Sequence, residues 1–509
     1  MESRKNIYGQ SLILALFSIL LTACSSKTEI PAVYTDIQQP VSIYPDYKEI
    51  IIPPNIAPLN FLVRSPGKEF VAVLAGEKDQ LTVSSSEGSS IRFEETDWQN
   101  FIRRHKGNSL NMTIYAHTGK GWLRYPPYTI WVADEDIDPY ISYRLIEPGY
   151  STYRQLGLYQ RNLTTFEEQP IYENNRSFDF RDNHCVNCHN YQNYSTRNML
   201  FHVRTNHSGT IIARDGQVEK IDFRNDSIIG GAVYPSWHPK RDWIVFSSNK
   251  TGQAFHTLNR EKVEVIDQAS DLIFYDVEQK TVLNIFKTDS LLETFPQWSP
   301  VGDRIYYCVA DLKALRSNSG TVTTTDFLHK YDRLHYNIMS SPFDSSTCSF
   351  GTPVPEVDCS AIGRSASVPR ISPDGRFLLF TQGDYGQFHI WHKSADLYVK
   401  DLENGTVYPL EALNSKDADS YHSWSSNGRW IVFSSRRDDG SYTRLYIAYF
   451  DPKGQAHKAF LLPQRSPEQN MTLLKSYNVP ELTTDPVSIS PETFRKIIYE
   501  AQAQTVTYR

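Results

Sequence analysis

The stretch that decides the fold is Tyr234-Pro-Ser-Trp-His-Pro-Lys-Arg-Asp-Trp-Ile-Val-Phe-Ser-Ser248, because the chain repeats its pattern. Three later copies follow it: Phe295-Pro-Gln-Trp-Ser-Pro-Val-Gly-Asp-Arg-Ile-Tyr-Tyr307, Val368-Pro-Arg-Ile-Ser-Pro-Asp-Gly-Arg-Phe-Leu-Leu-Phe380 and Tyr421-His-Ser-Trp-Ser-Ser-Asn-Gly-Arg-Trp-Ile-Val-Phe-Ser-Ser435. In each copy a turn containing Pro, Asp, Asn or Gly joins a segment that ends in Trp or Ile to an apolar run. The pattern therefore predicts a strand, a tight turn and a buried strand.

Outer-strand candidates such as 271–276 and 396–401 lie between the copies. A hairpin repeated at this spacing is typical of propeller blades. The copies resemble the TolB-type β-propeller repeat over roughly residues 200–465. The resemblance implies the fold but leaves the function open, since propellers host both binding and catalysis. Four clear copies are too few to close a ring comfortably, so we expect five or six blades.

The chain as a whole is predicted to be mainly β and to divide into five segments. Short alternating runs before residue 138 predict a β-sandwich-like domain, interrupted by one short helix at Thr96–His105. The tail is expected to hold another short helix at Pro491–Glu500. The expected segments are a signal peptide (1–23), the β-sandwich-like domain (24–138), a connector (139–198), the propeller (199–465) and a C-terminal tail (466–509).

The first residues read as an export signal. Arg4 and Lys5 precede an apolar stretch, Ser11–Leu21, that is too short to span a bilayer comfortably. The sequence Leu21-Thr22-Ala23-Cys24 resembles the lipobox of bacterial lipoproteins, which implies a lipid anchor on Cys24. An ordinary signal peptide or a short membrane anchor is the alternative. We expect a lipid-anchored protein in the envelope of a Gram-negative bacterium, at the outer membrane.

The motif that carries chemistry is His184-Cys185-Val186-Asn187-Cys188-His189, which contains C-x-x-C-H. Two thiols at this spacing on a turn can add to the two vinyl groups of haem, and the following histidine then lies beneath the iron. The motif resembles that of c-type cytochromes, which implies one covalent haem c on Cys185 and Cys188 with His189 as an iron ligand. A redox dithiol, a structural disulfide and a zinc half-site are the alternatives.

Two residues are candidates for the sixth iron ligand. Met199 and His202 follow the motif closely, so a short loop could bring either of them to the iron. The alternatives are that Met199 fills the core, that His202 is an ordinary strand residue, or that the iron is five-coordinate. Arg204 is a candidate partner for a haem propionate.

Charge and cysteine content narrow the classes of partner. The formal net charge is -6 and no basic block is present, which argues against nucleic acid. Three of the six cysteines lie outside the lipobox and the haem motif: Cys308, Cys348 and Cys359. Cys348 and Cys359 could form a disulfide around a loop or remain two free thiols.

These features predict electron transfer through one haem to a protein redox partner. No G-x-S-x-G, H-E-x-x-H, Walker loop or G-x-G-x-x-G occurs, so an enzyme is the less favoured class. One alternative is an envelope binding or assembly protein whose propeller recognises a protein or a glycan. Another is a haem enzyme of the peroxidase or reductase type.

Overall fold

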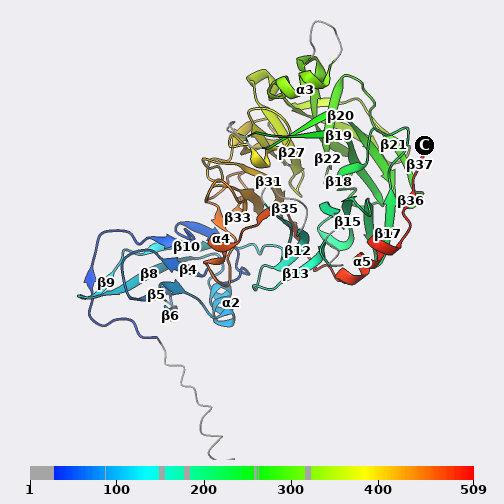
Figure 1. Ribbon diagram of the computed structural model, residues 1–509. Helices are drawn as coiled ribbons and strands as arrows, with labels where there is room; N and C mark the ends of the chain where they lie inside the picture. Colours follow the sequence, from blue (N-terminus) through cyan, green and yellow to red (C-terminus); the bar gives the residue numbers. More distant parts are fainter. Residues whose placement is uncertain are drawn as a thin grey trace, which may run out of the picture.

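The computed structural model describes residues 28–85, 88–147, 155–176, 184–256, 261, 263–315 and 322–509. Cys24 and the predicted signal peptide lie outside the described residues. A small β domain and a larger propeller lie side by side, and the chain passes from the first to the second (Figure 1). Of the helices in the described part of the chain, none has the length and apolarity that a membrane span needs.

The N-terminal domain has two sheets that share one core with helix α2 (Glu95–Arg104). This agrees with the predicted β-sandwich-like domain and its single helix. Glu94 caps α2 through a hydrogen bond from the Asp97 amide, and Trp98 and Phe101 are buried beneath it. The larger sheet contains β1 (Thr35–Asp36), β3 (Ile50–Ile52), β5 (Glu69–Ala75), β6 (Gln80–Ser84), β8 (Ser109–Thr118), β9 (Gly121–Arg124) and β10 (Tyr128–Val132), and the smaller contains β2 (Ile43–Tyr44), β4 (Phe61–Val63) and β7 (Ser90–Ile91).

Six blades make up the propeller within the described residues, which settles the choice between five and six. One residue pair, Ser270 with Leu292, joins blades 3 and 4 into one sheet. From the centre outward, the blades are β35 (Ser476–Thr483), β11 (Tyr140–Ile146), β12 (Gly157–Asn162), β13 (Glu168–Glu173); β14 (His184–Gln192), β15 (Ser195–Thr205), β16 (Gly209–Arg214), β17 (Gln217–Asp222); β18 (Ala232–Trp237), β19 (Trp243–Phe255), β20 (Val263–Asp276), β21 (Thr281–Asn284); β22 (Leu291–Trp298), β23 (Arg304–Asp311), β24 (Asn337–Asp344), β26 (Val354–Val357); β27 (Ser365–Ile371), β28 (Phe377–Gly383), β29 (Asp396–Asp401), β30 (Val407–Pro409); and β31 (Asp419–Trp424), β32 (Trp430–Ser435), β33 (Arg444–Tyr449), β34 (Phe460–Leu461).

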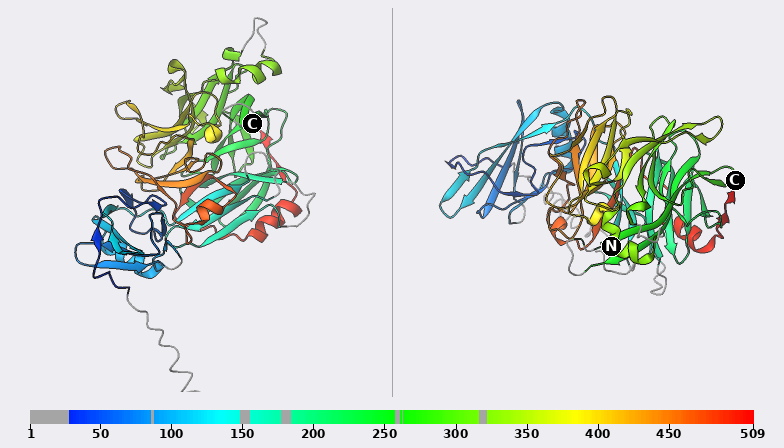
Figure 2. Two further views of the ribbon diagram at one scale, coloured as in Figure 1. Left: turned by 60° about the vertical axis from the view of Figure 1, so that its left-hand side comes forward. Right: turned by 90° about the horizontal axis from the view of Figure 1, so that it is seen from above.

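The ring closes through the C-terminal end of the chain. Each inner strand contacts the next in the order β14, β18, β22, β27, β31, β35 and back to β14. Strand β35 supplies the inner strand of blade 1, where it pairs antiparallel with β11. Figure 2 shows the red C-terminal segments lying against the cyan and green blades from early in the propeller. The first and last parts of the propeller are therefore held together by hydrogen bonds between distant segments.

The remaining elements are short and lie at the margins. Helix α5 (Pro491–Glu500) forms where the sequence predicts it, and the chain then adds β36 (Gln504–Thr505) to blade 2 and β37 (Thr507–Tyr508) to blade 3. The others are β25 (Ser349–Phe350), α3 (Thr324–Lys330), α4 (Gln469–Thr472), η1 (Leu312–Leu315), η2 (Tyr331–Arg333), η3 (Ser360–Ile362) and η4 (His389–Trp391).

The observed division of the chain differs from the expected one at both ends of the propeller. Residues 139–198 were expected to be an irregular connector, but they hold the three outer strands of blade 1 and the inner strand of blade 2. Residues 466–509 were expected to be a tail, but they hold the inner strand of blade 1. The physical reason is that β11 and β35 lie far apart in sequence, so neither shows the hairpin pattern that marks the other blades.

One backbone feature repeats in all six inner strands. Each has one non-glycine residue with a φ of about +50°, next to a shift in register against the second strand. Such a conformation costs free energy for side chains of this size, on the order of 1–3 kcal/mol, and marks functional sites in many proteins. The six residues, called here the bulge ring, are Cys188, Tyr234, Phe295, Val368, Tyr421 and Val479.

Candidate functional site: a thiol-lined pocket at the channel mouth

The C-x-x-C-H motif lies on β14, the inner strand of blade 2. Cys188 is the bulge-ring residue of this blade, and His189 occupies the position that proline or histidine takes in the other five. The motif is therefore part of the propeller and faces its centre. The sequence predicted a turn between two domains, and the structure differs from that prediction in placing the motif on an extended strand.

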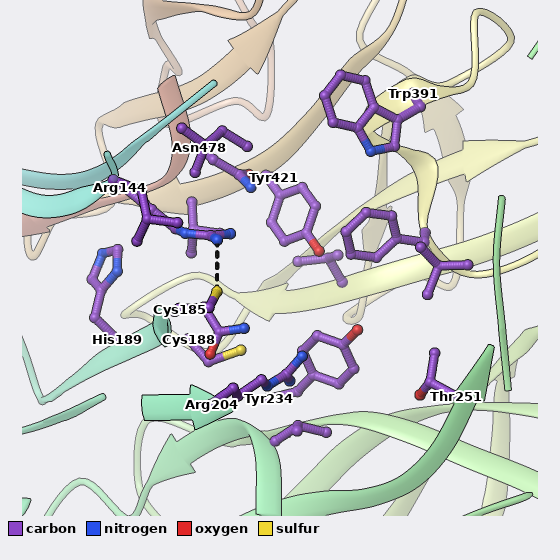
Figure 3. Close-up of a pocket in the computed structure, with 18 of the residues that line it drawn as sticks. Arg144, Cys185, Cys188, His189, Arg204, Tyr234, Thr251, Trp391, Tyr421 and Asn478 are labelled. Carbon is purple, nitrogen blue, oxygen red and sulfur yellow. Dashed lines mark hydrogen bonds between the residues drawn. The ribbon is translucent and has the colours of Figure 1, made fainter. Parts of the chain in front are cut away.

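The bulge brings both thiols to one side of the strand. Residues three apart on a regular strand point to opposite faces. Here Asn187 pairs with His202 and Asn190 pairs with Leu200, so Cys188 and His189 together lie opposite a single residue of β15. The extra residue of the bulge turns Cys188 back to the face of the strand that carries Cys185. As a result Cys185 and Cys188 line the same pocket (Figure 3).

The pocket lies at one end of the central channel and has a volume of about 250 Å³. All six bulge-ring residues line it, so every blade contributes to its wall. Three arginines, Arg144, Arg204 and Arg370, also line it, together with two carboxylates, those of Glu147 and Glu481. Aromatic side chains and guanidinium groups thus surround the two thiols.

His189 is buried beside the thiols, with 2% of its surface exposed. Neither ring nitrogen has a hydrogen-bond partner, although the backbone of Ser142 and of Val479 lies beside the ring. Burial lowers the pKa of His189 to about 3, so the imidazole is neutral at physiological pH. A neutral imidazole with an unpaired nitrogen has the lone pair that a metal ligand needs.

The two thiols differ in their surroundings. Arg144 donates a hydrogen bond to Cys185 Sγ at 3.1 Å, drawn as the dashed line in Figure 3. Burial raises the pKa of Cys188, so this side chain is a protonated thiol. Both cysteines are free rather than joined in a disulfide.

The structure does not bring Met199 or His202 to the pocket. Met199 is fully buried between the first two blades, beside Phe201 and Tyr191. His202 points to the other face of blade 2, where it contacts Phe246 and hydrogen-bonds Thr210 Oγ1 at 2.8 Å. Strand alternation explains the separation, because the two residues are three apart on the regular strand β15.

A hairpin arm and a loop build the outer wall of the pocket. Strands β19 and β20 continue beyond β18, and Thr251, Phe255 and Val263 from this arm line the pocket. Phe388 and Trp391 line it from the loop between β28 and β29. Blade 3 and blade 5 are thereby joined across the mouth of the channel.

Buried polar groups hold the arm against the loop. Glu264 on the arm accepts a hydrogen bond from Tyr385 at 2.6 Å and pairs with His392 Nε2 at 3.0 Å. Asp267 accepts a hydrogen bond from the side chain of Gln387 at 3.1 Å. Glu264, Asp267 and His392 each have less than 5% of their surface exposed, so the contact is made by buried polar side chains.

Replacing Asp267 with Asn is expected to change how stability depends on pH. Burial raises the pKa of Asp267 from 3.8 to about 7, despite hydrogen bonds from Thr251 and Asn249. From about pH 4 to pH 7 the folded chain keeps the proton of Asp267, whereas the unfolded chain has lost it. The contribution of Asp267 to the free energy of unfolding therefore falls as the pH rises through this range. The change corresponds to at most about 4 kcal/mol. The variant should therefore gain stability relative to wild type between pH 5 and pH 8, measured by urea unfolding.

Asp344→Asn serves as the control for that measurement. Hydrogen bonds from Ser346 lower the pKa of this exposed carboxyl, so its contribution has the opposite sign and is lost as pH falls. The interpretation of Asp267 is wrong if the stability difference between Asp267→Asn and wild type stays constant from pH 5 to pH 8.

A second cavity of about 420 Å³ lies further along the same inner strands. Arg370 and Glu481 line both cavities, so they mark the narrow part between them. Burial raises the pKa of Glu481 to about 7 and lowers that of Arg370. The rest of this cavity is lined by polar side chains, by apolar residues such as Ile371 and Leu482, and by Trp237, Trp298 and Trp424.

The remaining cysteines take no part in the pocket. Cys348 and Cys359 are free thiols, Cys348 next to β25 and Cys359 buried in the core of blades 4 and 5. Cys308 is buried in the same core. Among the described residues, no group of three or more His, Cys, Asp and Glu side chains is arranged to hold a metal ion.

Sequence reasoning missed several residues of the site. Arg144 was assigned to a connector, and Arg370, Tyr234 and Tyr421 were read only as strand residues. The repeats do carry a signal for the pocket wall. The first residue of each copy is the bulge-ring residue with the positive φ. The arm formed by β19 and β20 has no such sequence marker. It extends beyond β18 because the two strands continue to pair with each other.

The fold and the pocket together define the chain as a six-bladed β-propeller with an N-terminal β-sandwich-like domain and a thiol-lined pocket at one end of the channel. No protein-family model matches the sequence. No curated protein matches it either.

Solved structures with similarity to this chain include several β-propeller proteins. TolB from Acinetobacter baumannii is 12% identical with a TM-score of 0.43, over 76% of this chain and 85% of that one. A putative TolB from Agrobacterium tumefaciens is 14% identical with a TM-score of 0.37, over 66% and 96%. An auxiliary nutrient binding protein from Bacteroides thetaiotaomicron is 10% identical with a TM-score of 0.33, over 81% and 99%.

Proposed function

We propose that this protein is an envelope lipoprotein that carries one covalent haem c at the mouth of its propeller and transfers electrons to a protein partner. Cys185 and Cys188 would form the thioether bonds and His189 would bind the iron. The observation that carries the proposal is the bulge in β14, which gives both thiols and His189 access to one pocket. The lipobox at Cys24 motivates the membrane anchor.

The residues present fit a haem in three respects. Both cysteines are free and line the pocket, as thioether formation requires. The His189 ring is neutral, buried and without a hydrogen-bond partner, as an axial ligand must be before the iron arrives. Bulge-ring aromatics such as Tyr234 and Tyr421 supply the apolar contacts that a planar ligand needs.

Bound haem would supply a one-electron redox centre, and the protein would control access to it. The pocket volume of about 250 Å³ lies below the usual range for a small-molecule site, roughly 300–1,000 Å³. A ligand as large as haem would therefore keep an edge outside the pocket. An exposed edge at the mouth of the channel favours exchange of electrons with a docked protein.

The direct experiment is an optical spectrum of the full-length protein from a host that attaches c-type haem. We expect a pyridine haemochrome α-band and haem that stays with the chain in a denaturing gel. Protein that matures correctly and shows no α-band would contradict the proposal. A redox dithiol, a disulfide or a zinc site would then be the remaining explanations for the two thiols.

A haem enzyme is the second candidate, and one observation favours it. Met199 and His202 lie outside the pocket, and among its described lining residues no methionine and no histidine besides His189 is present. The pocket therefore offers neither a methionine nor a second histidine for the sixth position. Binding of carbon monoxide by the reduced protein would favour the enzyme, whereas a reduced spectrum unchanged by carbon monoxide would favour pure electron transfer.

A further inference from the structure

The pocket contains two guanidinium groups that form no salt bridge with a described carboxylate. Arg144 comes from β11 in blade 1 and Arg370 from β27 in blade 5, and both line the pocket. Neither makes a salt bridge with a described carboxylate within 4.0 Å. Arg204 from blade 2 lines the same pocket.

The hydrogen bonds of these two arginines go to neutral groups. The hydrogen bond made by Arg144 goes to a thiol, Cys185 Sγ, and its buried Nε has no partner. Arg370 donates to the backbone carbonyl of Pro369 at 3.0 Å. A guanidinium removed from water without an anion costs free energy, and a carboxylate that reaches it would offset that cost.

The same wall offers flat aromatic surface. Tyr234, Phe295 and Tyr421 come from the bulge ring, and Phe388 and Trp391 come from the loop of blade 5. Figure 3 shows Tyr234 and Tyr421 near the two thiols, with Arg144 above Cys185. Rings and guanidinium groups placed in this way suit a planar ligand that bears acidic groups at its margin.

We propose that the pocket binds a planar aromatic ligand through its carboxylates, with Arg144 and Arg370 as the residues that bind these groups. The proposal deepens the proposed haem function and rests on it for the natural ligand, because haem carries two carboxylates. It does not require the thioether bonds. Arg144 acts here as a binding residue in its own right, rather than as a partner of Cys185.

The experiment uses a full-length variant that cannot attach haem, Cys185→Ala with Cys188→Ala. Metal-free protoporphyrin IX and its dimethyl ester are titrated into this protein, and quenching of tryptophan fluorescence reports binding. We expect the free acid to bind at least about tenfold more tightly than the ester, because a charged hydrogen bond has a free energy large enough for such a factor. Equal affinities for acid and ester would overturn the proposal.

Arginine variants in this background test the role of Arg144. Arg144→Gln in the same background should weaken binding of the acid about tenfold and leave the ester unchanged, while Arg144→Lys should retain part of the preference. Arg224→Gln, at an exposed arginine paired with Asp222, is the matched control and should change neither affinity. Full preference for the acid in Arg144→Gln would overturn the assignment to Arg144.

The outcome separates this proposal from covalent haem attachment. If wild-type protein never acquires haem but the acid preference depends on Arg144, attachment fails and the acid site stands. If haem attaches and the apo variant does not distinguish acid from ester, attachment stands and the acid site fails.

Discussion

Full-length protein with Cys185→Ala and Cys188→Ala is expected to contain no covalent haem, even in a host that attaches c-type haem efficiently. Each thioether bond needs one of these sulfurs, and the bulge at Cys188 is what places both in one pocket. The α-band of the pyridine haemochrome, measured after extraction of loosely bound haem, should fall to background. An α-band that survives in the double variant would contradict attachment at these residues.

The chain offers matched controls for this experiment. Cys348→Ala removes a free thiol far from the pocket and should leave the haem content unchanged. His422 occupies in blade 6 the position that His189 occupies in blade 2, and it is equally buried. His189→Ala should alter the axial-ligand bands of the spectrum, and His422→Ala should not. Equal effects of the two substitutions would mean that His189 has only a packing role.

Truncation after Lys475 is expected to abolish cooperative folding of the propeller. The deletion removes β35, whose eight residues include six that are buried, and leaves β11 without its inner neighbour. Blade 6 and blade 2 then lose the strand that lies between them, because β31 and β14 both contact β35. An exposed sheet edge of this length also favours aggregation. Circular dichroism during heating should show no sharp transition for the propeller.

A shorter truncation, after Ala503, is the control for that deletion. It removes β36 and β37, which pair only with the outer strands of blades 2 and 3 and are exposed. This protein should unfold cooperatively with a small decrease in Tm. If both truncations unfold at the same temperature as the wild type, closure by β35 does not determine stability.

Most of the propeller could be predicted from the sequence, because four blades carry the hairpin repeat. The inner strands of blades 1 and 2 were not identified, although they follow a related pattern. Val479-Pro-Glu-Leu482 and Cys188-His-Asn-Tyr191 occupy the first four positions of the repeat, with other apolar or aromatic residues in place of its Trp or Ile. In blade 2 a shorter turn at Asn193 and Tyr194 leads into the second strand, and for β35 the second strand lies far upstream. Pairing between distant segments leaves no local sequence signal.

The candidate site was predicted in part. The C-x-x-C-H motif identified Cys185, Cys188 and His189, and the structure brings all three to one pocket, whereas haem itself stays a prediction. Met199 and His202 lie close to the motif in sequence, but strand alternation directs them into the cores on either side of blade 2. Their proximity in sequence predicted a loop that brings one of them to the iron. Both lie instead on a regular strand, which keeps their side chains away from the pocket.

Under the proposed export, closure by the last inner strand would also set an order of events. A chain that leaves a translocon from its N-terminus would expose the segment with Cys185 and Cys188 long before Ser476 and the residues after it. Until then the wall formed by Asn478, Val479 and Glu481 is missing, and the thiols are accessible from that side. A maturation enzyme working outside the cytoplasm would therefore meet an open half-site, and the arrival of the C-terminus would seal the finished pocket.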